Sequence, residues 1–180
     1  MVWPEQRLRS PPAWSLPQAY TLRTFRPEDA ADHVRLMHAA GFANWSQEQL
    51  AAALEKCLPD GFFVIEHSPS RRLVAAAMAQ HQPSACHPCG GELGWVAGDP
   101  DHKGKRLGRA VCAAATKRLL EIGYRNIYLL TDDFRLPAIK VYLELGYVPF
   151  LSAPDVEGRW RNVFARLGAD FEKTPSVRMP

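Results

Sequence analysis

Alternation and spacing of apolar residues divide the chain into strands and helices from residue 20 onward. Residues 20–25 alternate with period two and are rich in β-formers, which is typical of a half-buried strand. Residues 62–65 and 72–79 are apolar runs separated by a polar stretch, and they predict a strand pair. Similar short runs predict further strands at 92–97, 126–131, 147–151 and 160–165.

Apolar residues at helical spacing, bounded by start and stop signals, predict four helices. They cover approximately residues 27–40, 46–57, 107–122 and 136–145. Ser46 with Gln49 resembles a capping box, in which side chains and backbone N–H groups of the first turn satisfy one another. Gly123 and Gly146 follow the last two helices, where the left-handed conformation that ends a helix favours glycine.

The order β-α-α-β-β-β-α-β-α-β-β predicts an α/β fold. An antiparallel meander would feed a β-α-β crossover, giving a mixed central sheet flanked by helices. We expect one domain over residues 19–168, preceded by a Pro-rich extension over 1–18 and followed by a polar, frayed tail over 169–180. The extension contains tryptophans and prolines, so it either packs onto the domain or forms a mobile tail, and both alternatives stay open.

Composition agrees with one globular domain. The chain has 180 residues, of which 47% are hydrophobic and 23% charged, and this excludes wholesale disorder. The longest aliphatic run, Leu73–Ala79, is far shorter than the roughly 20 residues of a membrane span. Charged residues interrupt the N-terminus, and no signal-like apolar segment follows, so we expect a cytoplasmic protein.

Candidate chemistry is concentrated in the loop before the third predicted helix. With a formal net charge of only +3, the argument for an anionic ligand rests on where the cations are placed. Four cations and two glycines crowd into this loop: Lys103, Gly104, Lys105, Arg106, Gly108 and Arg109. Free N–H groups at a helix N-terminus, together with cations, form a phosphate site. The spacing matches neither a Walker A loop nor a Rossmann fingerprint.

This loop resembles the pyrophosphate-binding motif of the GNAT acyltransferase superfamily, [Q/R]-x-x-G-x-[G/A]. Residues 136–147, LPAIKVYLELGY, resemble that family's helix A-x-x-[LV]-Y-x-x-x-G-[FY]. The separation of the two motifs and the order of elements from Tyr20 to about Ala165 also agree with the family. Residues 92–108 are similar to the mycothiol-synthase-like branch, but this stretch does not assign a substrate.

The resemblance implies transfer of an acetyl group from acetyl-CoA directly to a primary amine of a small molecule or peptide, without a metal. Main-chain groups at the end of one strand would bind the pantetheine arm, and the loop would bind the pyrophosphate. The residues so assigned to the cofactor are Val96, Ala97, Gly98, Lys103, Gly104, Lys105, Arg106, Leu107, Gly108 and Arg135. Many family members dimerise, so a homodimer is possible.

The resemblance also implies two catalytic residues. Tyr142 matches the tyrosine that protonates the departing thiolate, although an aromatic on an apolar helix stripe is otherwise core. Glu92 is the candidate base, because burial raises a carboxyl pKa, although a glutamate at the start of a strand is otherwise exposed. Asp132 and Asp133 are rival acids or substrate contacts.

The sequence departs from the family pattern at three positions. Lys103 occupies the first motif position, Arg106 replaces the first glycine, and Arg135 stands where an asparagine is usual. The Arg106 side chain would either crowd the pyrophosphate and forbid a positive φ, or add a charge-assisted bond to phosphate. The first outcome favours an alternative function, a catalytically silent acyl-CoA-binding sensor or interaction module.

Two other chemistries have weaker support. Cys86 and Cys89 have the spacing of zinc ligands, but His81 or His87 would have to complete the shell, so a hairpin loop with two thiols is preferred. Nucleic-acid binding is disfavoured because the cations are few and local, with no interleaved aromatics.

Overall fold

The computed structural model describes residues 1–179 and shows an α/β fold around a five-stranded sheet, which confirms the predicted fold class. The strands are adjacent in chain order: β1 (Tyr20–Thr24), β2 (Cys57–His67), β3 (Arg72–His81), β4 (Gly91–Gly98) and β5 (Ile127–Tyr128). The first four pair antiparallel, and β5 pairs parallel to β4. The antiparallel meander therefore leads into a single crossover.

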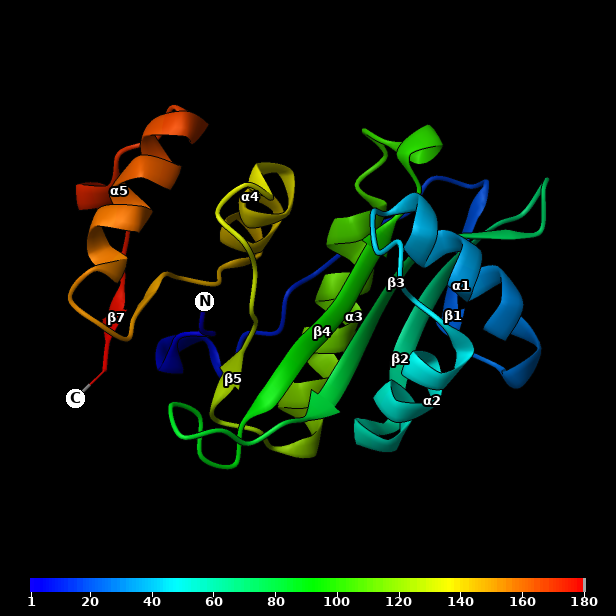
Figure 1. The fold of residues 1–180 in the computed structure, drawn as a ribbon, viewed down its shortest axis with the longest axis horizontal. Coiled ribbons are helices and arrows are strands. Elements are labelled where there is room, and N and C mark those ends of the chain that lie inside the picture. The colour runs from blue at the N-terminus through cyan, green and yellow to red at the C-terminus, as the bar shows by residue number, and fades with distance from the viewer. Residues whose placement is uncertain (180) are drawn as a thin grey trace.

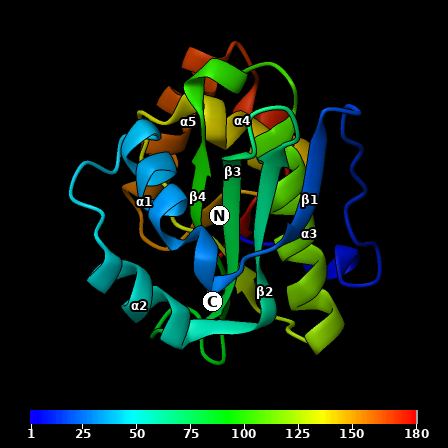
Figure 2. The same ribbon diagram turned by 90° about the vertical axis from the view of Figure 1, so that its right-hand side faces the viewer.

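Residues 1–179 contain five α-helices: α1 (Ala30–Ala39), α2 (Gln47–Lys56), α3 (Leu107–Ile122), α4 (Leu136–Leu145) and α5 (Val156–Leu167). In Figure 2, α1 and α2 lie on one side of the strands and α3 on the other. The short elements are η1 (Glu5–Arg7), η2 (Pro27–Asp29), η3 (Pro100–His102), β6 (Phe150–Leu151), η4 (Phe171–Lys173) and β7 (Val177–Arg178). Two large buried clusters, one on each face of the sheet, form most of the core, and a small third cluster consists of Val2, Tyr128 and Val148.

Local signals place the ends of the helices correctly. Helix α2 begins after Ser46, whose Oγ accepts from the Gln49 N–H at 3.3 Å, and the Gln49 Oε1 accepts from the Ser46 N–H at 2.9 Å. Gly123 and Gly146 end α3 and α4 in the left-handed conformation. These contacts are local in sequence, so the sequence could predict them.

The prediction of a strand at 160–165 is wrong, because residues 156–167 form helix α5. Val156, Trp160, Val163, Phe164 and Leu167 recur at helical spacing, and Val163 and Phe164 are buried. The helix lies at the end of the molecule away from α1 and α2 (Figure 1).

Two other segments differ from prediction. The strand expected at 126–131 is only two residues long, because the chain turns away from β4 after Tyr128 and leaves Leu130 72% exposed. Residues 59–61, Pro-Asp-Gly, are typical of a turn, yet they lie within β2, where the register against β3 shifts and Asp60 has a positive φ. The strand therefore continues through a local irregularity in its pairing.

Both chain ends pack onto the domain. Val2 forms bridges to Tyr128 and Val148, and Trp3 is buried, so the extension packs rather than forming a mobile tail. The tail expected to fray instead returns as β7, which pairs parallel with β6. Backbone hydrogen bonds therefore hold a segment that its polar composition did not suggest.

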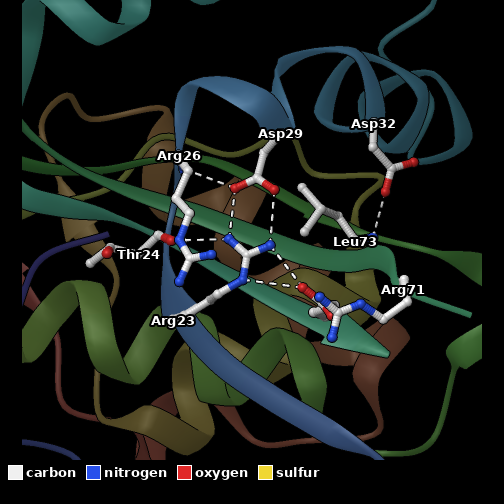
Figure 3. Close-up of polar contacts among 8 residues, drawn as sticks. Arg23, Thr24, Arg26, Asp29, Asp32, Arg71 and Leu73 are labelled. Atoms are coloured by element: carbon white, nitrogen blue, oxygen red, sulfur yellow. Dashed lines mark hydrogen bonds and ion pairs between the residues drawn. The ribbon is translucent and has the colours of Figure 1, made fainter. Parts of the chain in front are cut away.

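An ion network fixes the meander to α1 (Figure 3). Arg23 on β1 donates to both carboxylate oxygens of Asp29, at 2.6 and 2.9 Å, and to Glu66 on β2 at 2.9 Å. Asp32 on α1 accepts the Leu73 N–H of β3 at 2.6 Å. Removing one charged partner of such a part-buried network leaves the remaining charges unpaired, which is costly. These bonds therefore fix the position of α1 against the sheet.

Candidate functional site

The site begins where β4 and β5 separate. The two strands pair only through Gly91 with Ile127 and Glu92 with Tyr128, although β4 continues to Gly98. Beyond Glu92 the edge of β4 that faces β5 therefore has no partner strand among residues 1–179. An unpaired edge presents N–H and C=O groups to any extended chain that carries amides.

A β-bulge interrupts β4 at this edge. Ala76 pairs with Ala97 and Met78 with Gly94, so β4 carries one more residue than β3 between these pairs. Trp95 lies in this interval with a φ of +49°, a conformation rare outside glycine. Bulges next to active sites re-aim side chains, and here the bulge directs the Trp95 indole toward Trp45 and Phe42.

The loop before α3 presents unbonded N–H groups. Ala110 is the first helix residue to donate to a backbone carbonyl, that of Arg106, at 3.1 Å. Among the residues described, the backbone N–H groups of 106–109 donate to no backbone carbonyl. Arg106 adopts a φ of +59° and Gly104 a φ of +77°, so the arginine does not forbid the positive φ. These N–H groups and the nearby cations can bind an anion.

A cavity of about 520 Å³, here called the α3 cavity, joins the β4 edge to this loop. All the residues assigned to the cofactor except Lys105 line it: Val96, Ala97, Gly98, Lys103, Gly104, Arg106, Leu107, Gly108 and Arg135. The other lining residues include His102 in η3, Arg109 on α3 and Val141 on α4. The structure therefore brings nearly the whole predicted set around one cavity.

A second cavity of about 620 Å³, here called the α2 cavity, opens on the other side of the bulge. Its walls are α2, the middle of β4 and the loop after β5, and they include Phe42, Glu55, Trp95, Leu130 and Asp132. Four residues line both cavities: Val96, Arg135, Ala138 and Tyr142. The two cavities therefore meet beside these four side chains.

Tyr142 lies at this junction and is only 5% exposed. Burial raises the pKa of its phenol far above the ordinary value, which the nearby Arg135 offsets only in part. The phenol therefore keeps its proton at neutral pH, and it belongs to a side chain that lines both cavities. Ala138 and Val141, also on α4, are half-buried and line the α3 cavity.

Glu92 lies at the base of the α2 cavity, on β4 opposite Gln80 and Tyr128. Burial raises the pKa of its carboxyl, and Lys56 and the Tyr128 hydroxyl reduce that rise. A carboxylate with a raised pKa is a better proton acceptor near neutral pH than an exposed one.

The two rival acids are in different surroundings. Asp132 lines the α2 cavity and pairs with Arg135 Nε at 3.0 Å. The Arg135 guanidinium lies 4.8 Å from the Phe42 ring centroid. Asp133 lines neither cavity and accepts two hydrogen bonds from Arg159, at 2.9 and 3.0 Å. Only Asp132 thus shares a cavity with Glu92.

The residues considered for zinc do not form a cluster. Within residues 1–179, no group of three or more His, Cys, Asp or Glu side chains could hold a metal ion. His87 stacks on Tyr128 with ring centroids 4.0 Å apart and contacts Asn126 through Nδ1 at 3.1 Å, while Cys86 and Cys89 are exposed.

Sequence reasoning missed Phe42 and Trp95 at the site. No motif singles out Trp95, since a bulge has no strong sequence signal apart from the neighbouring Gly94. Phe42 follows the Gly41 helix stop and reaches the site only through tertiary packing. Neither residue belongs to a motif.

Comparison with known families and proteins adds independent findings. Residues 27–147 match the family model described as "Acetyltransferase (GNAT) family". Mycothiol acetyltransferase of Pseudarthrobacter chlorophenolicus is 30% identical over 76% of this chain and 45% of its own length. The Saccharomonospora viridis enzyme of that name is 30% identical over 81% of this chain and 48% of its own. The chain thus spans about half the length of these curated relatives.

Solved structures share the fold. The ribosomal-protein-S18-alanine N-acetyltransferase of Escherichia coli superposes with a TM-score of 0.58 at 21% identity, covering 76% of this chain and 86% of that one. A GCN5-related N-acetyltransferase from Sphaerobacter thermophilus gives 0.61 at 20% identity, covering 76% and 43%. Across the described residues, no helix is both long and apolar enough to cross a bilayer.

Proposed function

The chain belongs to the acetyltransferase (GNAT) family, and we propose that it transfers an acetyl group from acetyl-CoA to the primary amine of a small molecule. One observation carries this proposal: the buried, protonated Tyr142 lies where two cavities meet. Such a junction suits a reaction in which a donor and an acceptor enter from opposite sides and a proton is delivered between them.

The α3 cavity fits acetyl-CoA as the donor. Its walls offer the free edge of β4 to the amides of the pantetheine arm and the N–H groups of 106–109 to the pyrophosphate. Lys103, Arg106 and Arg109 add positive charge around those N–H groups. The α2 cavity then holds the acceptor amine beside Glu92.

Acetyl-CoA supplies a thioester carbonyl and a thiolate leaving group. Glu92 accepts a proton from the bound ammonium, and the freed nitrogen attacks the carbonyl carbon. A backbone N–H on the β4 edge, from Val96 to Gly98, stabilises the negative charge that develops on the carbonyl oxygen. As the carbon–sulfur bond breaks, Tyr142 donates its proton to the sulfur. The resulting phenolate takes the second proton from the nitrogen and so becomes a phenol again, and Glu92 releases its proton to solvent. An amide and a free thiol result.

Thermal unfolding with acetyl-CoA, CoA and ATP tests the donor. Acetyl-CoA at about 100 times its Kd would stabilise the fold by about 2.7 kcal/mol, a shift of several degrees, whereas ATP would not. Release of free thiol with a panel of amines then tests transfer. Stabilisation without thiol release from any amine would favour the alternative, a silent acyl-CoA-binding sensor, and no stabilisation at all would refute acetyl-CoA as the ligand.

A further inference from the structure

The proposed function leaves the acceptor undefined beyond an amine, and the walls of the α2 cavity define it further. We propose that Trp95 determines acceptor specificity, and that the acceptor is a small primary amine with an aromatic or branched apolar group on a short carbon chain. This inference rests on the proposed transfer reaction and adds the substrate class.

The first support is the conformation of Trp95. Its φ of +49° suits glycine, yet the position carries the largest side chain, and that side chain is 40% exposed at the cavity wall. Residues held in such conformations cluster at ligand sites, where the surrounding structure enforces them. Here the bulge in β4 provides that constraint, and it aims the indole away from the sheet core.

The second support is the surroundings of Trp95. The centroid of the buried Trp45 ring lies 4.4 Å from that of the Trp95 ring, and the Phe42 centroid lies 6.2 Å away. Both rings therefore pack against the indole and restrict its orientation. Leu130, on the loop after β5, lines the same cavity and is 72% exposed. Phe42, Trp95 and Leu130 therefore line one cavity from three separate parts of the chain, and an apolar ligand group in contact with them would remove them from water.

The third support is the polar end of the same cavity. Glu92 and Tyr142 line it, so an ammonium group there lies beside the proton acceptor and the proton donor proposed for transfer. A volume of about 620 Å³ falls within the range of small-molecule sites. The cavity also has polar walls, which include Glu55, Lys56 and Asp132. A charged nitrogen beside Glu92, with an apolar group against Phe42, Trp95 and Leu130, matches a small amine with a compact apolar body.

A matched set of acceptors tests the substrate class. With saturating acetyl-CoA, we expect kcat/KM for phenethylamine and isoamylamine to exceed that for ethanolamine by about 10-fold or more, since only the first two fill the apolar walls. A peptide beginning with phenylalanine is the comparison for a macromolecular source. Faster turnover of ethanolamine, or of the peptide, than of phenethylamine would overturn the proposal.

Three variants test Trp95 itself. Trp95→Gly suits the positive φ, so it removes the indole without adding backbone strain, and Trp95→Phe keeps an aromatic ring. We expect Trp95→Gly to lower kcat/KM for phenethylamine by about 10- to 100-fold, mostly through KM, and to leave ethanolamine turnover nearly unchanged. Trp95→Phe should stay within about threefold of the wild type. Trp14→Ala is the control, because Trp14 packs near Lys117 on α3, away from the cavity.

Calorimetric binding of phenethylamine to the wild-type protein with CoA present separates this inference from the proposed reaction. Saturable binding that Trp95→Gly weakens and Trp14→Ala preserves supports the site even if no product forms. Product from polar amines, with no binding of phenethylamine, would refute the site and leave the transfer reaction intact. An equal loss for every amine in Trp95→Gly would also refute a role in specificity.

Discussion

The α3 cavity and the α2 cavity lie on either side of the same strand but are built from different parts of the chain. The α3 cavity relies on main-chain groups, namely the free edge of β4 and the N–H groups of 106–109. The α2 cavity relies on side chains, above all Trp95, Leu130 and Glu92. A main-chain site tolerates substitution as long as the backbone keeps its path, whereas a side-chain site changes with each residue. One fold can therefore keep a constant donor and vary its acceptor.

The largest effect is expected at Tyr142, which belongs to both cavities. Tyr142→Phe removes only the hydroxyl, so kcat should fall by about 10²- to 10³-fold through loss of proton donation to the sulfur. Steady-state thiol release measures the loss. The control is stabilisation by acetyl-CoA, which should stay as in the wild type, and wild-type turnover in the variant would remove Tyr142 from the mechanism.

The next largest effect is expected at Glu92, which lines the α2 cavity and not the α3 cavity. Glu92→Gln should lower kcat/KM by about 10²-fold, because the amide cannot accept a proton. In the wild type, kcat/KM should rise with pH through the pKa of Glu92, which burial places above the usual carboxyl value, and the variant should lack this limb. A profile measured with one amine for both proteins checks this. An unchanged acidic limb would exclude Glu92 as the base and leave Asp132 as the rival.

The third effect concerns the support behind the α2 cavity. His33 is fully buried among Phe25, Trp45 and Phe62, and burial lowers its pKa to about 4. In the unfolded chain this histidine binds a proton below about pH 6.5, whereas in the folded protein it stays neutral down to about pH 4. Its contribution to the free energy of unfolding is therefore complete above pH 6.5 and is lost as pH falls toward 4. At pH 5 this lowers the free energy of unfolding by about 2 kcal/mol relative to its value above pH 6.5.

His33→Leu should flatten this dependence, and denaturant unfolding at pH 7.5 and pH 5 measures it. The difference between the stability lost by the wild type and that lost by the variant cancels the contributions of the other titrating groups. Equal losses in the two proteins would mean that His33 is not held neutral in the folded state.

The smallest effect is expected on the main-chain side. Arg106 adopts the left-handed conformation, which costs roughly 1 kcal/mol in a residue with a Cβ, so Arg106→Gly should stabilise the fold by about that amount. Loss of the guanidinium should weaken acetyl-CoA binding by less than about tenfold, because the backbone N–H groups remain. Loss of binding altogether would show that side chains, rather than main chain, hold the donor, and the contrast between the cavities would fail.

The same contrast explains what the sequence could predict. The ends of α3 and α4 follow from local glycine signals, and the loop with Arg106 follows from a motif of contiguous residues. Trp95 and Leu130 could not be assigned, because the register between β3 and β4 and the early end of β5 bring them together. The prediction of a strand in α5 rests on the Trp160–Ala165 stretch alone. Six residues are too few to distinguish the 3.6-residue period of a helix from the two-residue period of a strand.

The pairing of Trp95 with Trp45 has an optical consequence. Two indoles 4.4 Å apart with planes inclined at 58° couple their electronic transitions, so they should give a paired positive and negative band in the circular dichroism spectrum. A ligand that shifts the half-exposed ring against the buried one would change the amplitude of that couplet. The α2 cavity thus contains an intrinsic, label-free spectroscopic reporter, whereas no tryptophan is among the residues that line the α3 cavity.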